Sequence, residues 1–238
     1  MLLEVRNITK SFGGLIAVNG LSFSVDEGEV IGLIGPNGSG KTTSFHLISG
    51  FLRPDHGGIF FAGKNITGLK PNKVCHNGLA RTFQLTKPFA GMTAIQNVMI
   101  GRMYGSDPIG GMNQAEKDCE EILGFVGLGG KGSSPAVSFS VVERKRLEIA
   151  RALATKPKML LLDEMMSGLT HTEMDEALDL VKAIRDSGVT LIVVEHVMKA
   201  ILEISQRLIV LNYGEKIAEG IPQEVVKEKM VIEAYLGE

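Results

Sequence analysis

Residues 35–43 read GPNGSGKTT, a run that fits the spacing G-x-x-x-x-G-K-[ST]. Glycines let a loop adopt backbone angles that a side chain would forbid, so successive N–H groups can surround phosphate oxygens. A helix starting near Lys41 would add the positive end of its dipole. The Lys41 ammonium would reach the β- and γ-phosphates, and the Thr42 hydroxyl would be a ligand for Mg²⁺. The predicted nucleotide contacts are Gly35, Asn37, Gly38, Ser39, Gly40, Lys41, Thr42 and Thr43.

Two acids follow a second apolar run, in which MLLL leads into Asp163 and Glu164. A buried parallel strand delivers the side chains at its carboxyl end to the edge of the sheet where a phosphate loop lies. Asp163 could therefore hold Mg²⁺ through water, and Glu164 could polarise a water that attacks a phosphate.

The surrounding sequence predicts the elements that would position these residues. VIGLI precedes the glycine-rich loop, and KMLLLDE, TLIVVE and QRLIVLN are buried-strand patterns separated by helical ones. Such alternation predicts a parallel sheet with both faces covered by helices. We also expect a strand over LARTFQ that ends at Gln84, helices between Thr93 and Gly127, and a helix over Val141–Ala154.

Composition narrows the class of protein. The 238 residues are 44% hydrophobic with a net charge of −2, which argues against a disordered chain and against bulk binding of nucleic acid. No signal peptide or membrane span is predicted, because no apolar run is long enough. Cys75 and Cys119 share no metal-ligand spacing, so we expect two reduced thiols in an intracellular protein.

Nearly the whole chain resembles the ATP-binding subunits of ABC transporters. The motifs follow the order of that family: GPNGSGKTT, TFQ, a degenerate SFSVVE, LLLDE and VVEH. ARTFQ, LEIARALATKP and IEAYLGE resemble the group that serves branched-chain amino acid importers, and the ATPases of lipopolysaccharide and urea transport read similarly.

The resemblance implies roles for further residues. Phe12 would stack on adenine, with Val18 near the ring. Gln84 would sense Mg²⁺ and the attacking water, so the metal set would be Thr42, Gln84 and Asp163. His196 would contact the γ-phosphate and act with Glu164 and Gln84 in catalysis. The loop at Ser167–Thr170 would cross to a partner subunit.

The signature motif of the family departs from its usual form. Ser140 keeps the serine position, but Val142 replaces the glycine that lets a helix start approach the ATP of a partner subunit. We therefore expect weaker closure around ATP and slow hydrolysis. Ser140 and Glu143 also form a capping box, S-x-x-E, so the serine could act as a cap alone or as a cap that also contacts phosphate.

Neighbouring positions depart as well. Met165 stands where a proline usually rigidifies the turn after the glutamate, and Thr170 stands where aspartate or asparagine is common. The run Arg144–Arg146 is interpreted as a solvated helix face. If the partner ATPase is a different chain with an intact signature glycine, the two sites of the dimer would be unequal.

The expected fold is α/β, with a RecA-like P-loop NTPase core, an N-terminal antiparallel β subdomain and an inserted α-helical subdomain. Residues 1–87 and 155–238 would form the core of one ABC domain, and residues 88–154 the helical part. Its cofactors would be ATP and Mg²⁺. The partners would be a second ABC ATPase subunit, membrane permeases that dock near Gln84, Phe89 and Met92, and indirectly a solute-binding protein.

The expected location is cytoplasmic and peripheral, on the inner face of the cell membrane. Two rival functions are a regulatory nucleotide-binding subunit with weak hydrolysis and an ABC protein of translation or DNA repair. The second rival usually carries two ATPase cassettes or a coiled-coil insertion, and this sequence contains one phosphate loop.

Overall fold

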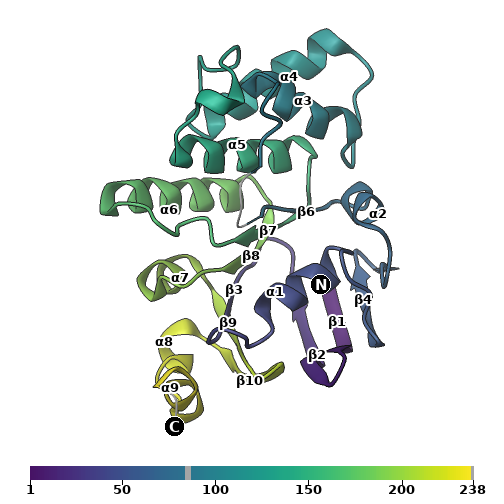
Figure 1. Cartoon of the computed structure of the whole chain (residues 1–238), viewed down its shortest axis with the longest axis vertical. Helices are drawn as coiled ribbons and strands as arrows, with labels where there is room; N and C mark the ends of the chain where they lie inside the picture. The colour runs from purple at the N-terminus through teal and green to yellow at the C-terminus, as the bar shows by residue number, and fades with distance from the viewer. Residues whose placement is uncertain (84–86, 237–238) are drawn as a thin grey trace.

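A computed structural model describes residues 1–83 and 87–236, and Figure 1 shows their arrangement. The strands are β1 (Leu3–Phe12), β2 (Leu15–Val25), β3 (Val30–Ile34), β4 (His56–Phe61), β5 (Lys64–Asn65), β6 (Leu79–Arg81), β7 (Met159–Asp163), β8 (Thr190–Val194), β9 (Arg207–Asn212) and β10 (Glu215–Gly220). The helices are α1 (Lys41–Ile48), α2 (Pro71–His76), α3 (Ala94–Tyr104), α4 (Met112–Phe125), α5 (Val141–Ala154), α6 (His171–Asp186), α7 (Met198–Ile204), α8 (Pro222–Val225) and α9 (Lys229–Leu236), with a 3-10 turn at Ala136–Ser138.

The larger sheet has the order β10-β9-β3-β8-β7-β6 within the described residues. Strands β6, β7, β8, β3 and β9 are parallel, and β10 joins β9 as an antiparallel hairpin. Every residue of β3, β7 and β8 is buried, which explains why these strands read as continuous apolar runs instead of alternating ones.

Side-chain alternation along these strands divides the apolar core in two. On β3, Val30 and Ile34 point into the cluster formed with helices α3 to α7. Ile31 and Leu33 point to the opposite face, into a second cluster with Phe45 of α1 and the strands β1 and β2. The parallel sheet is thus covered on both sides, as the sequence predicts.

The smaller sheet is antiparallel and has the order β2-β1-β4-β5 in the described part of the chain. Leu21, Phe23 and Val25 on β2 are all buried, in agreement with the alternation of LSFSV. Strand β1 ends at Phe12, and a turn that includes Gly13 joins it to β2.

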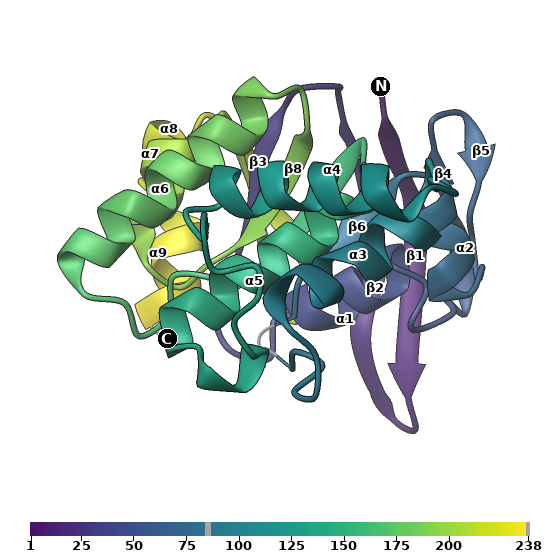
Figure 2. The ribbon, with the colours of Figure 1, turned by 90° about the horizontal axis from the view of Figure 1, so that it is seen from above.

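Helices α3, α4 and α5 pack together above the larger sheet (Figures 1 and 2). The predicted helix over Val141–Ala154 is confirmed, and Leu147, Ala150 and Ala154 form its buried stripe. Ser140 and Glu143 make both hydrogen bonds of the predicted capping box, because the Glu143 carboxylate accepts from the Ser140 N–H and the Ser140 hydroxyl accepts in return.

The strand predicted over LARTFQ is shorter than expected. It ends at Arg81, because the N–H of Phe83 donates to the Glu148 carboxylate of α5 instead of continuing the ladder. Gln84 lies outside the described residues. Of the helices in the described part of the chain, none is both long and apolar enough to span a bilayer.

The interpretation of Arg144–Arg146 as a solvated face is wrong. The Lys145 ammonium donates to the carbonyl oxygens of Met165, at 3.0 Å, and of Ser167. The guanidinium of Arg144 donates to a carbonyl of the preceding turn, and that of Arg146 pairs with a carboxylate of α6. The run itself gave no indication of the partners of Lys145 and Arg146, because these lie at least 20 residues away in the sequence.

Candidate nucleotide-binding and hydrolysis site

The glycine-rich loop joins β3 to α1, the order that a phosphate loop requires. Two of its glycines are required by space as well as by backbone angle. At Gly35, with φ of 149°, an added Cβ would lie 2.1 Å from the Leu211 carbonyl oxygen. At Gly40, with φ of 103°, it would lie 2.5 Å from the Ala17 carbonyl oxygen. Both positions therefore exclude any side chain, and the loop is held against β2 and β9.

Lys41 is the first residue of α1, and its side chain turns back into the loop. The ammonium donates to the carbonyl oxygens of Gly35 at 2.7 Å and Pro36 at 2.9 Å. Burial lowers the pKa of Lys41, while the carboxylates of Glu164 and Asp163 oppose that shift. A buried cation held among backbone amides can bind a phosphate group with little competition from water.

Glu164 and His196 face each other at the carboxyl ends of β7 and β8. The imidazole Nε2 of His196 lies 2.8 Å from Oε1 of Glu164. Glu164 has a φ of 49°, a left-handed backbone conformation that is uncommon outside glycine, and its N–H donates to the Val194 carbonyl. This strained turn positions a carboxylate beside a group able to donate or accept a proton.

A cavity of about 370 Å³ collects most of the residues predicted for nucleotide binding. Its lining comprises Phe12, Leu15, Ile16, Ala17, Asn37, Gly38, Ser39, Gly40, Lys41, Thr42, Thr43, Glu164, His196 and Tyr213. Val18 is absent from that lining among the described residues, because it is fully buried beneath Gly40. The fold thus brings Phe12, the loop, Glu164 and His196 to one hollow.

Apolar side chains gather at the end of the cavity where Phe12 lies. Phe12, Leu15, Ile16 and Tyr213 are each at least 47% exposed, and the Lys10 ammonium lies 5.6 Å from the centre of the Phe12 ring. A flat aromatic base could stack on such a surface. Leu15, Ile16 and Tyr213 were not predicted from the sequence.

Asp163 ends β7 and pairs with Arg81 of the neighbouring strand. The Nη2 atom of Arg81 lies 2.7 Å from Oδ2 of Asp163, and both side chains are about 5% exposed or less. The backbone N–H of Asp163 also donates to the Thr82 hydroxyl. Asp163 is therefore fixed from β6 on one side, a contact that the sequence did not indicate.

The donors at this edge fit Mg²⁺. Thr42 and Asp163 offer a hydroxyl and a carboxylate, the oxygen ligands that Mg²⁺ prefers. In the described ranges, no three His, Cys, Asp or Glu side chains form a set that could hold a metal by themselves. Mg²⁺ in nucleotide sites is usually bound by one or two protein oxygens together with the substrate phosphates, so this sparse set suits an ion that arrives with the nucleotide.

The loop after Glu164 lacks proline but is fixed by hydrogen bonds. The Glu195 carboxylate accepts from the Met166 N–H at 2.7 Å, and Lys145 donates to two carbonyls of the same loop. Burial raises the pKa of Glu195 and lowers that of Lys145. The stiffness that a proline would give is therefore replaced by contacts from β8 and α5.

The loop after Glu164 leads into α6, and the signature motif leads into α5. Both helices begin with a capping box. Thr170 caps the start of α6 through a capping box with Glu173. This hydrogen bonding explains how a threonine can serve at a position where an acid or amide is common. At α5, Lys131 and the Ser140 backbone lower the pKa of Glu143 to about 2. Ser140, Val142 and Glu143 lie outside the cavity of this chain, consistent with a role toward another subunit.

A phosphate loop between a buried strand and a helix, with acids at the carboxyl end of a neighbouring strand, defines a P-loop nucleotide-binding protein. Within that class, the ABC transporter family matches residues 18–167. The chain belongs to the ABC transporter family, whose ATPase subunits hydrolyse ATP. Residues 215–238 match a second family description, branched-chain amino acid ATP-binding cassette transporter.

Similar proteins cover the chain from end to end. The high-affinity branched-chain amino acid transport ATP-binding protein BraF of Pseudomonas aeruginosa is 37% identical, over 100% of this chain and 98% of its own length. The probable branched-chain amino acid transport ATP-binding protein LivG of Methanocaldococcus jannaschii is 34% identical, with the same coverage.

Solved structures confirm the predicted fold. The ADP conformation of MJ1267, an ATP-binding cassette of an ABC transporter, superposes with a TM-score of 0.91 at 33% identity, over 100% of this chain and 99% of that one. A nucleotide-free ATP-binding cassette from an ABC transporter gives 0.88 at 34% identity, with the same coverage. The P-loop core, the antiparallel β region and the helical insertion are therefore those of an ABC ATPase.

Proposed function

We propose that this chain is the ATP-hydrolysing subunit of an importer for branched-chain amino acids. The observation that carries hydrolysis is the Glu164–His196 pair, which faces the phosphate loop across one cavity. The substrate class rests on the similarity to BraF and LivG and on the match of residues 215–238.

The loop would bind the triphosphate through the N–H groups between Gly38 and Thr43, and Lys41 would exchange its carbonyl contacts for phosphate oxygens. Phe12, with Leu15 and Ile16 beside it, would stack on the adenine. Val18 would support the loop from below, since it is buried against Gly40.

Glu164 would accept a proton from the attacking water, or polarise it, and His196 would orient that carboxylate and contact the γ-phosphate. Thr42, Asp163 and Gln84 would hold Mg²⁺, which supplies charge neutralisation at the β- and γ-phosphates when it is bound. The proton in this scheme moves from the attacking water to the Glu164 carboxylate, which the His196 imidazole contacts at 2.8 Å.

Two ATPase subunits would bind head to tail, so the start of α5 would face the ATP of the partner. Ser140 would donate its hydroxyl to that phosphate while Glu143 keeps the helix capped. Val142 would keep the two chains further apart than glycine does. In a heterodimer, the site completed by a partner with an intact glycine would then be the more active one.

Separate permease subunits would dock on a groove of about 490 Å³ between the core and the helical part. Phe51, Phe83 and Tyr104 line the groove and are 42% to 67% exposed. Phe89 and Met92, predicted as docking residues, are also exposed but lie outside that lining. Docking would place the chain on the inner face of the membrane, and the solute-binding protein would lie on the far side. Residues 1–87 and 155–238 would form the core of the domain, and residues 88–154 its helical part.

The test is reconstitution of the chain with permease subunits and a solute-binding protein in vesicles. We expect ATP-dependent uptake of leucine, isoleucine or valine, and loss of uptake with Glu164→Gln. Uptake of urea but of none of these amino acids would contradict the substrate, and unchanged uptake by Glu164→Gln would support a regulatory subunit instead. Wild-type phosphate release at background level would contradict hydrolysis itself.

A further inference from the structure

Arg81 belongs to the docking groove and to the catalytic edge at once. Its guanidinium lines the groove, and its carbon Cζ lies 5.5 Å from the centre of the Phe45 ring, 6.0 Å from that of Phe51 and 5.2 Å from that of Phe83. Phe51 and Phe83 contact each other edge to face, at 5.4 Å between ring centres. The cation is therefore surrounded by three aromatic rings, of which Phe51 and Phe83 line the groove.

On its other side, Arg81 holds the carboxylate that the site offers to Mg²⁺. The Nη2–Oδ2 distance to Asp163 is 2.7 Å, and Nη1 donates to the Ser49 hydroxyl at 3.3 Å. Within the described residues, Nε of Arg81 is buried without a hydrogen-bond partner. An arginine this enclosed, with only part of its donor set satisfied, depends strongly on its one carboxylate.

We propose that Arg81 is a positioning residue for Asp163, through which an occupant of the groove alters the affinity of the site for Mg²⁺. The inference rests on the proposed function, in which the groove receives a permease and Asp163 receives the metal. While Arg81 holds Oδ2, the metal must share the negative charge of Asp163 with a guanidinium. Any contact that moves Phe51 or admits water around Arg81 weakens that hold, because the attraction falls as the local dielectric rises.

The experiment measures how much Mg²⁺ tightens the binding of a non-hydrolysable ATP analogue to the full chain. Titration calorimetry in Mg²⁺ and in EDTA gives two Kd values, whose ratio is the metal enhancement. Arg81→Met should increase this enhancement about fivefold or more over wild type, because Asp163 then loses the cation that pairs with it at 2.7 Å and Mg²⁺ no longer competes with that cation. Arg81→Lys, which keeps the charge, should return the ratio toward the wild-type value.

Arg102→Met is the matched control. Arg102 is 6% exposed and pairs with Asp118 at 2.8 Å in the helical part, far from the phosphate loop in the sequence and absent from its cavity. It should lower the thermal stability without changing the metal enhancement. If Arg81→Met gives the same enhancement as Arg102→Met, Arg81 is only a structural residue and the proposal is overturned.

A second pair of variants tests the groove side. Phe51→Ala should open the guanidinium to water and raise the enhancement by a smaller factor, about twofold, whereas Phe125→Ala should leave it unchanged. Phe51 and Phe125 are 49% and 44% exposed, so the two changes remove similar surface. No effect of Phe51→Ala would overturn the link to the groove. Absence of analogue binding by wild type in either buffer would contradict the proposed function instead.

Discussion

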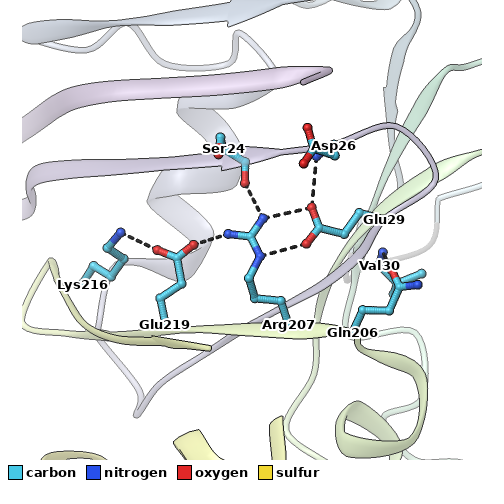
Figure 3. Close-up of polar contacts among 8 residues, drawn as sticks. All are labelled: Ser24, Asp26, Glu29, Val30, Gln206, Arg207, Lys216 and Glu219. Carbon is cyan, nitrogen blue, oxygen red and sulfur yellow. Dashed lines mark hydrogen bonds and ion pairs between the residues drawn. The ribbon is translucent and has the colours of Figure 1, made fainter. Parts of the chain in front are cut away.

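Arg81 and Arg207 lie at opposite ends of the strands of the larger sheet and have different surroundings. Arg81 is at the carboxyl ends of the strands, called the carboxyl edge below, and Arg207 is at their amino ends, called the amino edge. Arg207 begins β9, where Glu29 binds two of its nitrogens at 2.8 and 2.9 Å, Glu219 pairs with a third, and the Ser24 carbonyl accepts at 2.7 Å (Figure 3). The hydrogen bonds that Arg207 donates to Glu29 raise the pKa of Arg207, whereas burial lowers that of Arg81. Arg81 ends β6 and has one carboxylate partner, Asp163.

The difference separates structural stability from chemistry. At the amino edge, Arg207 of β9 connects β2, β10 and the residue before β3. All three nitrogens of its guanidinium donate hydrogen bonds. At the carboxyl edge, buried groups keep unused bonding capacity. Of five buried side-chain atoms without a partner among the described residues, three belong to Arg81, Glu148 and Glu195 near that edge. Such atoms destabilise the fold but can respond when a charged ligand binds.

The largest effect should come from Glu164→Gln, at the carboxyl edge. It removes the proposed proton acceptor, so phosphate release by the assembled complex should fall by about 10²- to 10⁴-fold. The free energy of unfolding should change little, because the amide can keep the contact with His196. Phosphate release and urea unfolding of the same preparation check both parts. A large loss of stability with activity retained would mean that Glu164 serves stability and not chemistry, which would contradict the comparison.

The next effect is a pH dependence that Glu148 causes. Burial raises its pKa to about 7, so the folded chain keeps a proton that the unfolded chain has lost above its ordinary value of 4.5. The free energy of unfolding should therefore fall as pH rises from about 4.5 to 7, by at most about 3 kcal/mol from this group. Glu148→Gln should remove that decrease, so the variant should be the more stable protein at pH 8.

Urea unfolding at pH 5 and pH 8 checks this prediction. The matched variant is Glu143→Gln, because the pKa of Glu143 is lowered to about 2 and the residue stays ionised over this range. If the free energy of unfolding changes equally between pH 5 and pH 8 in wild type and in Glu148→Gln, Glu148 is ionised over the whole range and the prediction is wrong.

Arg207→Met tests the amino edge and should have a smaller effect. Removing the guanidinium leaves Glu29 and Glu219 without their shared partner, at a cost of about 2 kcal/mol in the free energy of unfolding. The affinity for nucleotide should be unchanged. Arg6→Met, which breaks an exposed pair with Glu4, should produce a much smaller change. A weaker nucleotide affinity in Arg207→Met would mean that the two edges are not independent.

Val142→Gly has the smallest expected effect, because the start of α5 that it changes would face the ATP of the other subunit. Removing the branched side chain should allow closer approach of the two chains and raise ATP turnover of the assembled complex about three- to tenfold, or ~1 kcal/mol. Glycine inside the first turn should also lower stability slightly. The control is Val141→Gly, the adjacent exposed valine. Equal rates for wild type and Val142→Gly would rule out a steric role.

Sequence patterns were sufficient for features built from neighbouring residues. The buried runs of β3 and β7, the phosphate loop and the capping box of Ser140 and Glu143 each lie within a few residues, so spacing alone predicted them. Glu164 was predicted from its place after a buried strand and His196 from its family position, and the structure adds the contact between them.

Contacts between distant segments could not be predicted in this way. Strands β6 and β7 are neighbours in the sheet, although residues 82–158 separate them in the chain. Arg81 therefore gave no sign of its partner Asp163, and Lys145 gave none of its contacts after Glu164. Sequence patterns also failed between adjacent residues. Val18 was predicted to lie near the adenine, but its neighbours Ile16 and Ala17 line the cavity instead.

Hydrogen–deuterium exchange of the intact chain, with and without Mg²⁺ and a non-hydrolysable ATP analogue, compares the two edges in one measurement. If phosphates bind at the carboxyl edge, amide exchange should slow in residues 35–43 and stay the same in residues 24–30, beside Arg207. Unchanged exchange in residues 35–43 at saturating analogue, or slowing confined to residues 24–30, would contradict the placement of the nucleotide.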